Sequence, residues 1–403
     1  MGKGVDFLLV SKTKQGNLLN VTGIRNLDYL RAMRRTESFF CPECDERVIL
    51  KVGTKKMPHF AHQKGSACSE SYERESEYHL KGKIALFEWL QEQGVESSLE
   101  SFDKKIAQRP DIGFNFEGAR YAIEYQCSSI PEELFIKRTE NYFNANITPI
   151  WIMAGKNIKR PTNNRVALSK FDFLFLANSH SGMSIPSYCP IMNTLIIVQR
   201  ILPVSVKNSL AHFSIKSLTK ASITDLIRPT PNRPNQLNDW LKEIRRAKNI
   251  TIPYYQSTQN KFLQELYSHS IIPSMLPPEI GLPVAHAHFI ETPALEWQSY
   301  LLIDLLNRSQ PIPIDKIIYA FKRRVGRNEI KLRNLPLARR GNALLAVKAY
   351  MKLLVKLNIF QAVSQTHIKR INPIRTQNNV ERQLEWETNF YRKNFKIIND
   401  GLK

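Results

Sequence analysis

The strongest constraint on the fold of this sequence is a β-hairpin predicted over residues 109–128. Two runs of alternating apolar and polar residues flank the dipeptide Glu117-Gly118, a combination typical of a two-residue hairpin turn. If these two residues form the turn, counting back along both strands places Asp111 directly opposite Glu124. Opposed residues share one face of a sheet, so we expect the two carboxylates to face the same way.

Two opposed carboxylates destabilise a sheet unless a cation lies between them. Mg²⁺ (or Mn²⁺) prefers such oxygen ligands and completes its shell with backbone carbonyls and water. Asp111 and Glu124, together with Gln126 on the same face, therefore predict a divalent-metal site. The alternative is a solvated strand face that carries two acids, because a motif of this kind is weak by itself.

The charge of the chain points to an acidic partner. Its 403 residues include 58 Lys and Arg against 36 Asp and Glu, so the net charge is +22. Residues 315–403 contribute +14 of this, with 20 basic and 6 acidic residues. Nucleic acid is the first candidate and an anionic membrane the second. No secretory or myristoylation signal is recognised and the apolar runs are short, so we expect a cytoplasmic protein without membrane insertion.

Cysteines and histidines in residues 1–70 predict a second metal site. Cys41 and Cys44 form a Cys-Pro-x-Cys knuckle, and His62 and Cys68 follow at a spacing typical of treble-clef or ribbon-like zinc sites. We expect these four residues to hold a structural Zn²⁺ in a β-rich, zinc-ribbon-like module, with His59 as the alternative third ligand. The remaining alternative is a reduced cysteine pair near ordinary surface histidines.

Periodicity beyond this module predicts the order helix, three strands, helix, strand. Apolar residues at helical spacing predict a helix over 75–90, and a strand over 95–102 precedes the hairpin. A Ser-Ile-Pro-Glu-Glu run starts a helix that ends near Tyr142, and a buried strand is expected over 148–153. We therefore predict an α/β fold, and the αβββαβ order of residues 71–160 resembles the core of restriction-endonuclease-like, or PD-(D/E)xK, nucleases.

Several unusual motifs occur in order in the first half of the chain. They are FxCPxCxxxVxLKxG…HFAH over 39–62, ESxxHxxxK over 75–83, RPDI over 109–112 and IEYQCSxI over 123–130. By these motifs residues 1–155 resemble the competence protein CoiA-like family, and the rest of the chain resembles it in length and basic helical character. The resemblance implies a protein that acts when a competent bacterium takes up DNA and that promotes recombination of this DNA into the chromosome.

The resemblance also implies roles for individual residues. Asp111 and Glu124 would hold Mg²⁺, and Glu75 on the preceding helix would reach the metal or its water. Gln126 stands where the superfamily usually has lysine, so it would position water without supplying a positive charge. His79 would orient water or contact phosphate. DNA contacts are implied for Lys83, Arg109, Ser128 and Arg138. For His79 and Arg138 the alternatives are an ordinary helix-surface histidine and a solvated cation.

These features predict a Mg²⁺-dependent deoxyribonuclease that hydrolyses phosphodiester bonds in DNA intermediates of transformation. Its expected partner is single-stranded or branched DNA, with recombination proteins as further candidates. Because Gln126 lacks the charge of lysine, the main alternative is a non-catalytic DNA-binding recombination mediator with a relic nuclease fold. A restriction-type or phage-defence nuclease is a third hypothesis.

The second half is predicted to be a mixed connecting region (161–250) followed by a mostly helical, basic DNA-binding region (251–403). Three expected helices and a strand-like run in the latter resemble a winged-helix unit. Residues 322–340 include eight basic residues and one acid. We expect this segment to contact the DNA backbone, the alternative being a solvated loop. The cations expected to do so are Lys322, Arg323, Arg324 and Arg327.

Overall fold

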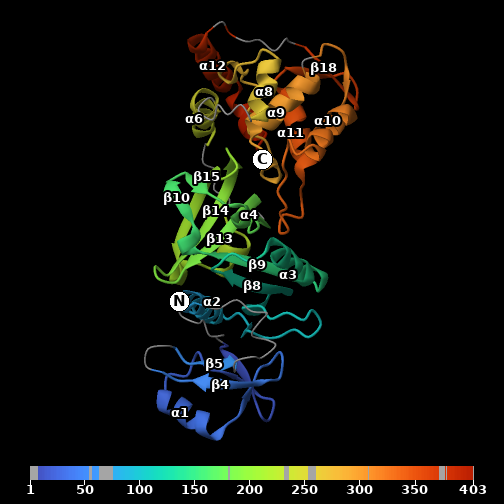
Figure 1. Ribbon diagram of the computed structural model, residues 1–403. Helices are drawn as coiled ribbons and strands as arrows, with labels where there is room; N and C mark the ends of the chain where they lie inside the picture. Colours follow the sequence, from blue (N-terminus) through green and yellow to red (C-terminus); the bar gives the residue numbers. More distant parts are fainter. Residues whose placement is uncertain are drawn as a thin grey trace.

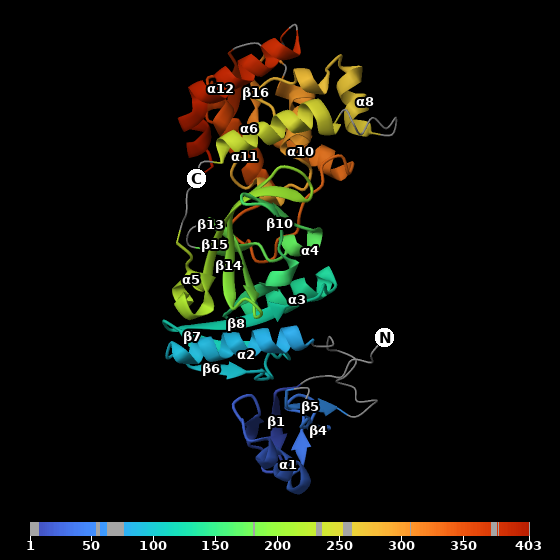
Figure 2. The ribbon, with the colours of Figure 1, turned by 90° about the vertical axis from the view of Figure 1, so that its left-hand side faces the viewer.

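The computed structural model describes residues 8–53, 57–62, 76–179, 182–230, 236–252, 260–306, 308–371, 377 and 379–402, so Cys68 and Glu75 lie outside the described residues. Figures 1 and 2 show three regions that follow one another along one long axis: a β-rich N-terminal module, a large twisted sheet and a helical C-terminal region. Among the described helices, none combines the length and the hydrophobicity that crossing a membrane requires.

The N-terminal module is an antiparallel sheet in the order β2-β1-β3-β4-β5 with one helix. Its elements are β1 (Val10–Thr13), β2 (Leu18–Asn20), α1 (Leu27–Thr36), β3 (Phe39–Phe40), β4 (Arg47–Lys51) and β5 (His59–His62). Asn26 caps α1 by accepting two backbone N–H groups, as asparagine commonly does at this position. Leu30 from the helix packs with Phe39 and Phe60 from the strands in a small core of the module's own.

The predicted order of helix, three strands, helix and strand occurs between residues 77 and 154. The elements are α2 (Glu77–Glu92), β6 (Ser97–Leu99), β7 (Ile112–Phe116), β8 (Ala119–Gln126), α3 (Glu132–Asn144) and β9 (Ile147–Ala154). Strands β6, β7 and β8 are antiparallel, whereas β8 and β9 are parallel because α3 returns the chain across the sheet. Ser76 caps α2 by accepting the N–H of His79.

The hairpin has the register that the sequence predicts. Ile112 pairs with Ile123, and the two turn residues both adopt positive φ, 48° and 76°, the pattern of a type I′ turn. Asp111 lies one residue beyond β7, and the same count places it level with Glu124. The sequence therefore predicted correctly which residues face one another along the two strands.

The sheet continues past residue 160, where the sequence suggested a domain boundary. Strand β9 also pairs in parallel with β13, and the described strands form one sheet in the order β10-β11-β15-β14-β13-β9-β8-β7-β6, with β12 beside β13. The added elements are β10 (Lys159–Thr162), β11 (Arg165–Ala167), α4 (Lys170–Phe173), β12 (Ala177–Ser179), β13 (Gly182–Cys189), β14 (Thr194–Pro203), β15 (Asn208–Ser217) and α5 (Ile223–Ile227). Much of the expected connecting region is therefore sheet.

The sheet separates two hydrophobic cores. Helices α2 and α5 cover one face, where Tyr125 and Ile152 are buried. Helix α3 covers the other face, where the rings of Phe135 and Trp151 stack with centroids 3.9 Å apart. Gly82 lets α2 approach β8 very closely, because a Cβ at this position would lie 2.0 Å from the Tyr125 ring. This contact brings one turn of α2 directly onto the strand that carries Glu124.

The C-terminal region contains the order helix, strand, helix, helix, strand, strand. These elements are α9 (Ala294–Leu301), β16 (Ile312–Pro313), α10 (Ile314–Gly326), α11 (Ala343–Lys356), β17 (Phe360–Ala362) and β18 (His367–Arg370). Their strands pair in the order β16-β18-β17, so the element order is that of a winged-helix unit. Helices α6 (Leu237–Arg246), α8 (Lys261–Ser268) and α12 (Val380–Asp400) surround it. Its core continues into the core on the α3 face of the sheet.

Arg324 of α10 lies inside this region. Its side chain is 5% exposed, and its guanidinium bonds the carboxylates of Glu265 (2.5 Å), Asp304 (2.6 Å) and Glu329 (2.9 Å). A cation enclosed by three carboxylates is not available to a DNA backbone. The DNA contact expected of Arg324 is therefore not compatible with its position in this structure.

We expect Arg324→Met to lower the free energy of unfolding by about 3–5 kcal/mol, because three carboxylates lose their buried cation. Arg327→Met, at an exposed position just after the same helix, should change it by less than about 0.5 kcal/mol. Urea denaturation of both variants measures the difference. Small and equal effects would contradict a structural role for Arg324.

Candidate functional site

Three carboxylates occupy the ends of three adjacent strands. Glu100 follows β6, Asp111 precedes β7 and Glu124 lies in β8. The strand registers place each level with the next, and the N–H of Glu100 donates to the carbonyl of Asp111 at 3.0 Å. Glu100 and Glu124 are only 2% and 4% exposed. Carboxylates buried in this way require cations or hydrogen-bond donors, which the two helices supply.

Lys83 of α2 is the cation between Glu100 and Asp111. Its side chain is 1% exposed, and its Nζ lies 2.5 Å from Glu100 Oε1 and 3.5 Å from Asp111 Oδ1. Burial disfavours the charge of Glu100, but Lys83 and Arg109 outweigh it and hold the pKa of Glu100 below its usual range. The other oxygen of Glu100 accepts the N–H of Leu9 at 2.8 Å.

Asp111 is held from the side of α2. Its Oδ2 accepts the backbone N–H of Tyr125 at 2.8 Å and lies 3.3 Å from Nε2 of His79. Burial again opposes ionisation, but Lys83 and His79 outweigh it and keep the pKa of Asp111 well below its usual range. Asp111 is therefore an ionised carboxylate at neutral pH, held by two partners that lie one helical turn apart on α2.

Glu124 is held from the side of α3. Its Oε1 accepts hydrogen bonds from the guanidinium of Arg138 and from the hydroxyl of Tyr142. Burial raises the pKa of Glu124, Arg138 opposes the shift and the charge of Asp111 adds to it. Arg138 also donates to the carbonyl of Arg109 at 3.3 Å, so it is anchored at two points.

The two carboxylates expected to face the same way are thus bound by helices on opposite faces of the sheet. Asp111 lies just beyond its strand, where the pleat no longer directs the side chain, and its partners His79 and Lys83 both come from α2. Within the described ranges, no group of three metal-ligating side chains forms around Asp111 or Glu124. In this structure, cations from the protein neutralise each carboxylate separately.

The donor set still fits a hard divalent cation. Mg²⁺ commonly takes one or two carboxylates from a protein and fills its other positions with water and substrate phosphates. Asp111 is ionised and 15% exposed, so it can act as a ligand directly. Glu124 would be the second ligand only if a metal displaced Arg138 and Tyr142 from its carboxylate.

The other residues that the sequence analysis expected at this site differ in their burial and in their hydrogen-bond partners. Gln126 donates from Nε2 to the carbonyl of Ser128 at 3.0 Å, and Ser128 is exposed. Lys83 is fully buried and Arg138 is bound to Glu124, so neither is placed to contact DNA in this structure. The expected role of Glu75 falls outside the described residues.

Glu100 and Tyr142 are site residues that the sequence analysis missed. The signal for Glu100 was available: it is an acid at the end of the strand expected over 95–102, and pairing that strand with β7 places it level with Asp111. Tyr142 lies one helical turn beyond Arg138, on the same face of α3, and both bind the same oxygen of Glu124.

The predicted zinc ligands come together in the N-terminal module. The ligand atoms of Cys41, Cys44 and His62 all lie within 4.8 Å of one another, and Cys44 Sγ is 3.4 Å from His62 Nε2. Zn–S and Zn–N bond lengths give a tetrahedral edge of about 3.5 Å, so this spacing fits zinc. His59 instead makes a 2.8 Å hydrogen bond to the carbonyl of Met57 and is not part of the group. The proposed fourth ligand, Cys68, lies outside the described residues.

We expect His62→Asn and Cys44→Ser to reduce bound zinc from about one ion per chain to near zero, because each removes a ligand. His59→Asn and Cys127→Ser should leave the zinc content unchanged, since neither residue belongs to the group. Metal analysis of the purified variants measures the result. Zinc retained by His62→Asn but lost by His59→Asn would show that the other histidine is the ligand.

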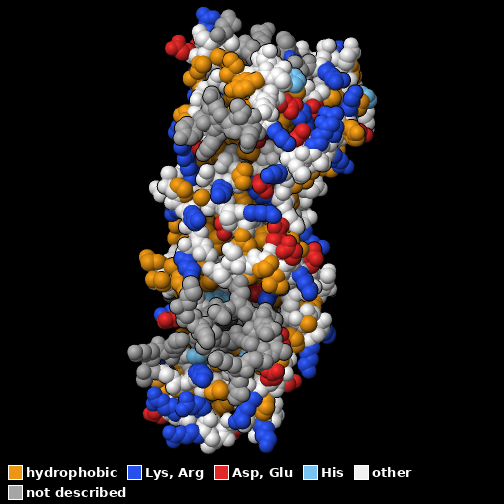
Figure 3. Space-filling model, viewed as in Figure 1, with side chains coloured by type: hydrophobic (Ala, Val, Ile, Leu, Met, Phe, Trp, Pro, Cys, Tyr) orange, Lys and Arg blue, Asp and Glu red, His pale blue; other side chains and the backbone are white. Residues whose placement is uncertain are grey.

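In the C-terminal region, Lys322, Arg323 and Arg327 are exposed, although Arg323 also lies 3.2 Å from Asp304. Figure 3 shows Lys and Arg side chains gathered over the part of this region that contains α10 and β18. Of the four cations expected to contact DNA, Lys322, Arg323 and Arg327 thus lie on the surface, whereas Arg324 is buried.

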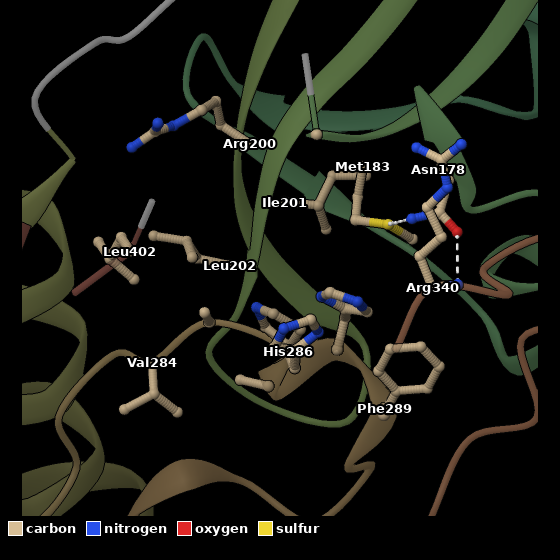
Figure 4. Close-up of a pocket in the computed structure, with 15 residues that line it drawn as sticks. Asn178, Met183, Arg200, Ile201, Leu202, Val284, His286, Phe289, Arg340 and Leu402 are labelled. Carbon is tan, nitrogen blue, oxygen red and sulfur yellow. Dashed lines mark hydrogen bonds between the residues drawn. The ribbon is translucent and has the colours of Figure 1, made fainter. Parts of the chain in front are cut away.

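Among the cavities lined by described residues, two border strands of the large sheet. One of about 490 Å³ borders the acidic site, since Pro110 and Tyr142 line it together with the exposed cations Lys104, Lys105 and Arg120. Figure 4 shows the other, of about 280 Å³, in which Arg200 lies on one side of His286 and Arg340 stands beside Asn178 on the other. None of the predicted site residues is among the described residues that line this second cavity.

Comparison with known proteins gives matches along most of the chain. Family models described as the N-terminal, nuclease-like and C-terminal domains of competence protein CoiA match residues 24–71, 75–231 and 236–384. The chain is 31% identical to competence protein CoiA of Bacillus subtilis over 300 residues, which is 73% of this chain and 80% of the relative. No solved structure matches the chain significantly.

Proposed function

Because the chain belongs to the competence protein CoiA family, we propose that it is a metal-dependent DNA nuclease of the transformation pathway. It processes DNA intermediates in the cytoplasm so that incoming DNA recombines with the chromosome. The observation that carries this proposal is the row of buried strand-end carboxylates, with Lys83 among them, inside the nuclease-like domain. We assign the domain to the PD-(D/E)xK type on its αβββαβ order and its acids.

In this proposal Asp111 and Glu124 hold Mg²⁺ or Mn²⁺. The bound ion would activate water and stabilise the charge that develops on the scissile phosphate. Asp111 needs no proton loss to bind it, because the pKa of this carboxyl is already low. Displaced from Glu124 by the ion, Arg138 would be able to bind a phosphate oxygen, for which its planar guanidinium is well suited. His79, Gln126 and Glu75 orient the attacking water, and Arg109 and Ser128 contact the DNA backbone.

Lys83 supplies the positive charge that Gln126 lacks. Related nucleases carry a lysine on the strand, at the position of Gln126, whereas here an ammonium group reaches Asp111 from α2 at 3.5 Å. A fixed cation in a buried site acts at a lower effective dielectric than one in water, so it stabilises negative charge more strongly. This arrangement supports an active enzyme despite Gln126.

DNA binding away from the acids is assigned to exposed cations. Lys322, Arg323 and Arg327 in the C-terminal region, and the cations that line the 490 Å³ cavity beside Tyr142, offer contacts to phosphates. The substrates that we propose are single-stranded or branched DNA, with recombination proteins as further partners. The structural zinc in the N-terminal module would stabilise that module without taking part in the chemistry.

One observation favours the second candidate, a non-catalytic recombination mediator. The protein's own groups bind both acids: Asp111 is paired with Lys83 and His79, and Glu124 is paired with Arg138 and accepts a hydrogen bond from Tyr142. A fold stabilised by such internal ion pairs does not require a metal. In that case the domain binds DNA without cutting it.

Cleavage of labelled single-stranded, duplex and branched DNA separates the two candidates. The wild-type protein and Glu124→Ala are incubated with Mg²⁺, Mn²⁺ or a chelator, and binding is measured in the same samples. We expect cutting by the wild type that the chelator and the substitution both abolish, with DNA binding intact. Tight binding without cutting of any substrate, in any metal, would overturn the nuclease and favour the mediator.

A further inference from the structure

The third helix of the winged-helix unit, α11, has a row of lysines on its surface. Lys348, Lys352 and Lys356 are all exposed, and each follows the previous one by four residues. Residues at this spacing lie above one another on one helix face, and eight residues of helix rise about 12 Å. The helix sequence ALLAVKAYMKLLVK contains no acid. Among the ion pairs of the described residues, none involves these three lysines.

The opposite face of α11 is buried in the hydrophobic core. Tyr350, Val347 and Leu354 are at most 1% exposed, and α11 packs beside β17 in the small sheet. This excludes a membrane-surface role for the helix, because an interfacial helix inserts an exposed apolar face into the lipid. It also argues against a single-stranded partner, since such sites stack bases on exposed aromatic rings and the aromatic residue of this helix, Tyr350, is buried.

We propose that the lysine row of α11 is a binding surface for the backbone of double-stranded DNA. The row spans about 12 Å, the width of the major groove of B-form DNA, so its ends can reach phosphates on both sides of the groove. Lysine binds phosphate as a point charge and reads no base pattern here, so the binding does not depend on base sequence. The surface deepens the proposed function, because it would hold the duplex arm of a branched substrate.

Binding, measured without cleavage, tests this surface. The protein carries Asp111→Asn and is kept in chelator, so that duplex DNA is not cut whether or not the chain is a nuclease. In this background, Lys348→Gln/Lys352→Gln/Lys356→Gln is compared with Arg392→Gln/Lys393→Gln/Lys396→Gln. The second triple removes the same charge from exposed positions on α12. Fluorescence anisotropy with a labelled duplex is recorded between about 50 and 200 mM salt.

We expect the triple variant of α11 to bind duplex DNA at least about tenfold more weakly at 100 mM salt. It should also reduce the slope of log K against log salt by about 2.7, because each of three phosphates that is no longer neutralised accounts for about 0.9. The α12 triple should change both quantities little, and duplexes of different sequence should behave alike. Equal losses from the two triples would overturn the proposal, since binding would then follow net charge. An equal weakening of single-stranded DNA binding, or an effect confined to anionic vesicles, would also overturn it.

Thermal unfolding of each variant shows whether the fold is retained. If the α11 triple does not fold, the single substitution Lys352→Glu, at the middle of the row, takes its place with Lys393→Glu as its control. A change in duplex affinity in Lys352→Glu but not in the control supports the surface, and equal affinities overturn it. Because cleavage is never measured, a failure here is distinct from a failure of the proposed nuclease.

Discussion

Asp111→Asn is expected to lower the rate of metal-dependent DNA cleavage by about 10³- to 10⁴-fold, with DNA binding retained. Asparagine keeps an oxygen that can accept the N–H of Tyr125, so the local backbone is preserved. It removes the ionised oxygen that we propose as a direct metal ligand. Single-turnover cleavage with saturating protein measures the rate, and anisotropy on the same DNA measures binding. Cleavage within tenfold of the wild type would contradict this role for Asp111.

The same variant should change the response of stability to acid. The pKa of Asp111 in the folded protein lies below its ordinary value of 3.8, so the ionised carboxylate stabilises the fold above about pH 4. This stabilisation is lost as the pH falls from 3.8 toward the lower folded pKa, because the unfolded chain then binds the proton more readily. The free energy of unfolding of the wild type should therefore fall more steeply below about pH 4 than that of Asp111→Asn, as urea titrations at each pH would show.

Lys83→Met is expected to lower the free energy of unfolding by about 3–5 kcal/mol. The substitution leaves Glu100 buried beside a hydrophobic side chain, and breaking a buried ion pair from one side costs about this much. Glu100→Gln in the same chain should recover at least about 2 kcal/mol, because the uncompensated charge is then gone. Lys81→Met, on the exposed side of the same helix, should cost less than about 1 kcal/mol.

The double variant also separates the effect of Lys83 on stability from its effect on the rate of cleavage. If Lys83 supplies the charge missing at Gln126, Lys83→Met/Glu100→Gln should fold and bind DNA yet cleave on the order of 10²-fold more slowly than the wild type. Full cleavage by a folded double variant would reduce Lys83 to a structural residue. No recovery of stability in the double variant would contradict the ion pair itself.

The hairpin shows what sequence can predict well. Alternation and a Glu-Gly turn determine the register, because a one-residue slip would turn every side chain to the other face. The level positions of Asp111 and Glu124 followed from counting, and the structure has the register from which they are counted. The metal-ligating group of Cys41, Cys44 and His62 could likewise be predicted, since ligand type and spacing are local properties.

The partners of the acids were not predictable in the same way. Whether Arg138 contacts DNA or Glu124 depends on how α3 lies on the sheet, which no local pattern encodes. Arg324 looked like one more cation in a basic run, and two of its three carboxylate partners, Glu265 and Asp304, lie 59 and 20 residues away in the sequence. The continuation of the sheet through β13 was hidden for the same reason, because parallel pairing joins strands that are far apart along the chain.

The hydrogen bond from Leu9 to Glu100 joins the N-terminal module to the acidic site. Leu8 pairs with Phe60 on the strand that carries His62, while the next residue, Leu9, packs in the core beneath α2. Two consecutive residues therefore belong to two different cores, and the second donates to the carboxylate that neutralises Lys83. If zinc in this module changes the affinity of the acidic site for a divalent ion through this hydrogen bond, thermodynamic reciprocity requires that the ion change the affinity of the module for zinc by the same factor. Each metal would in that case act as an effector of the other.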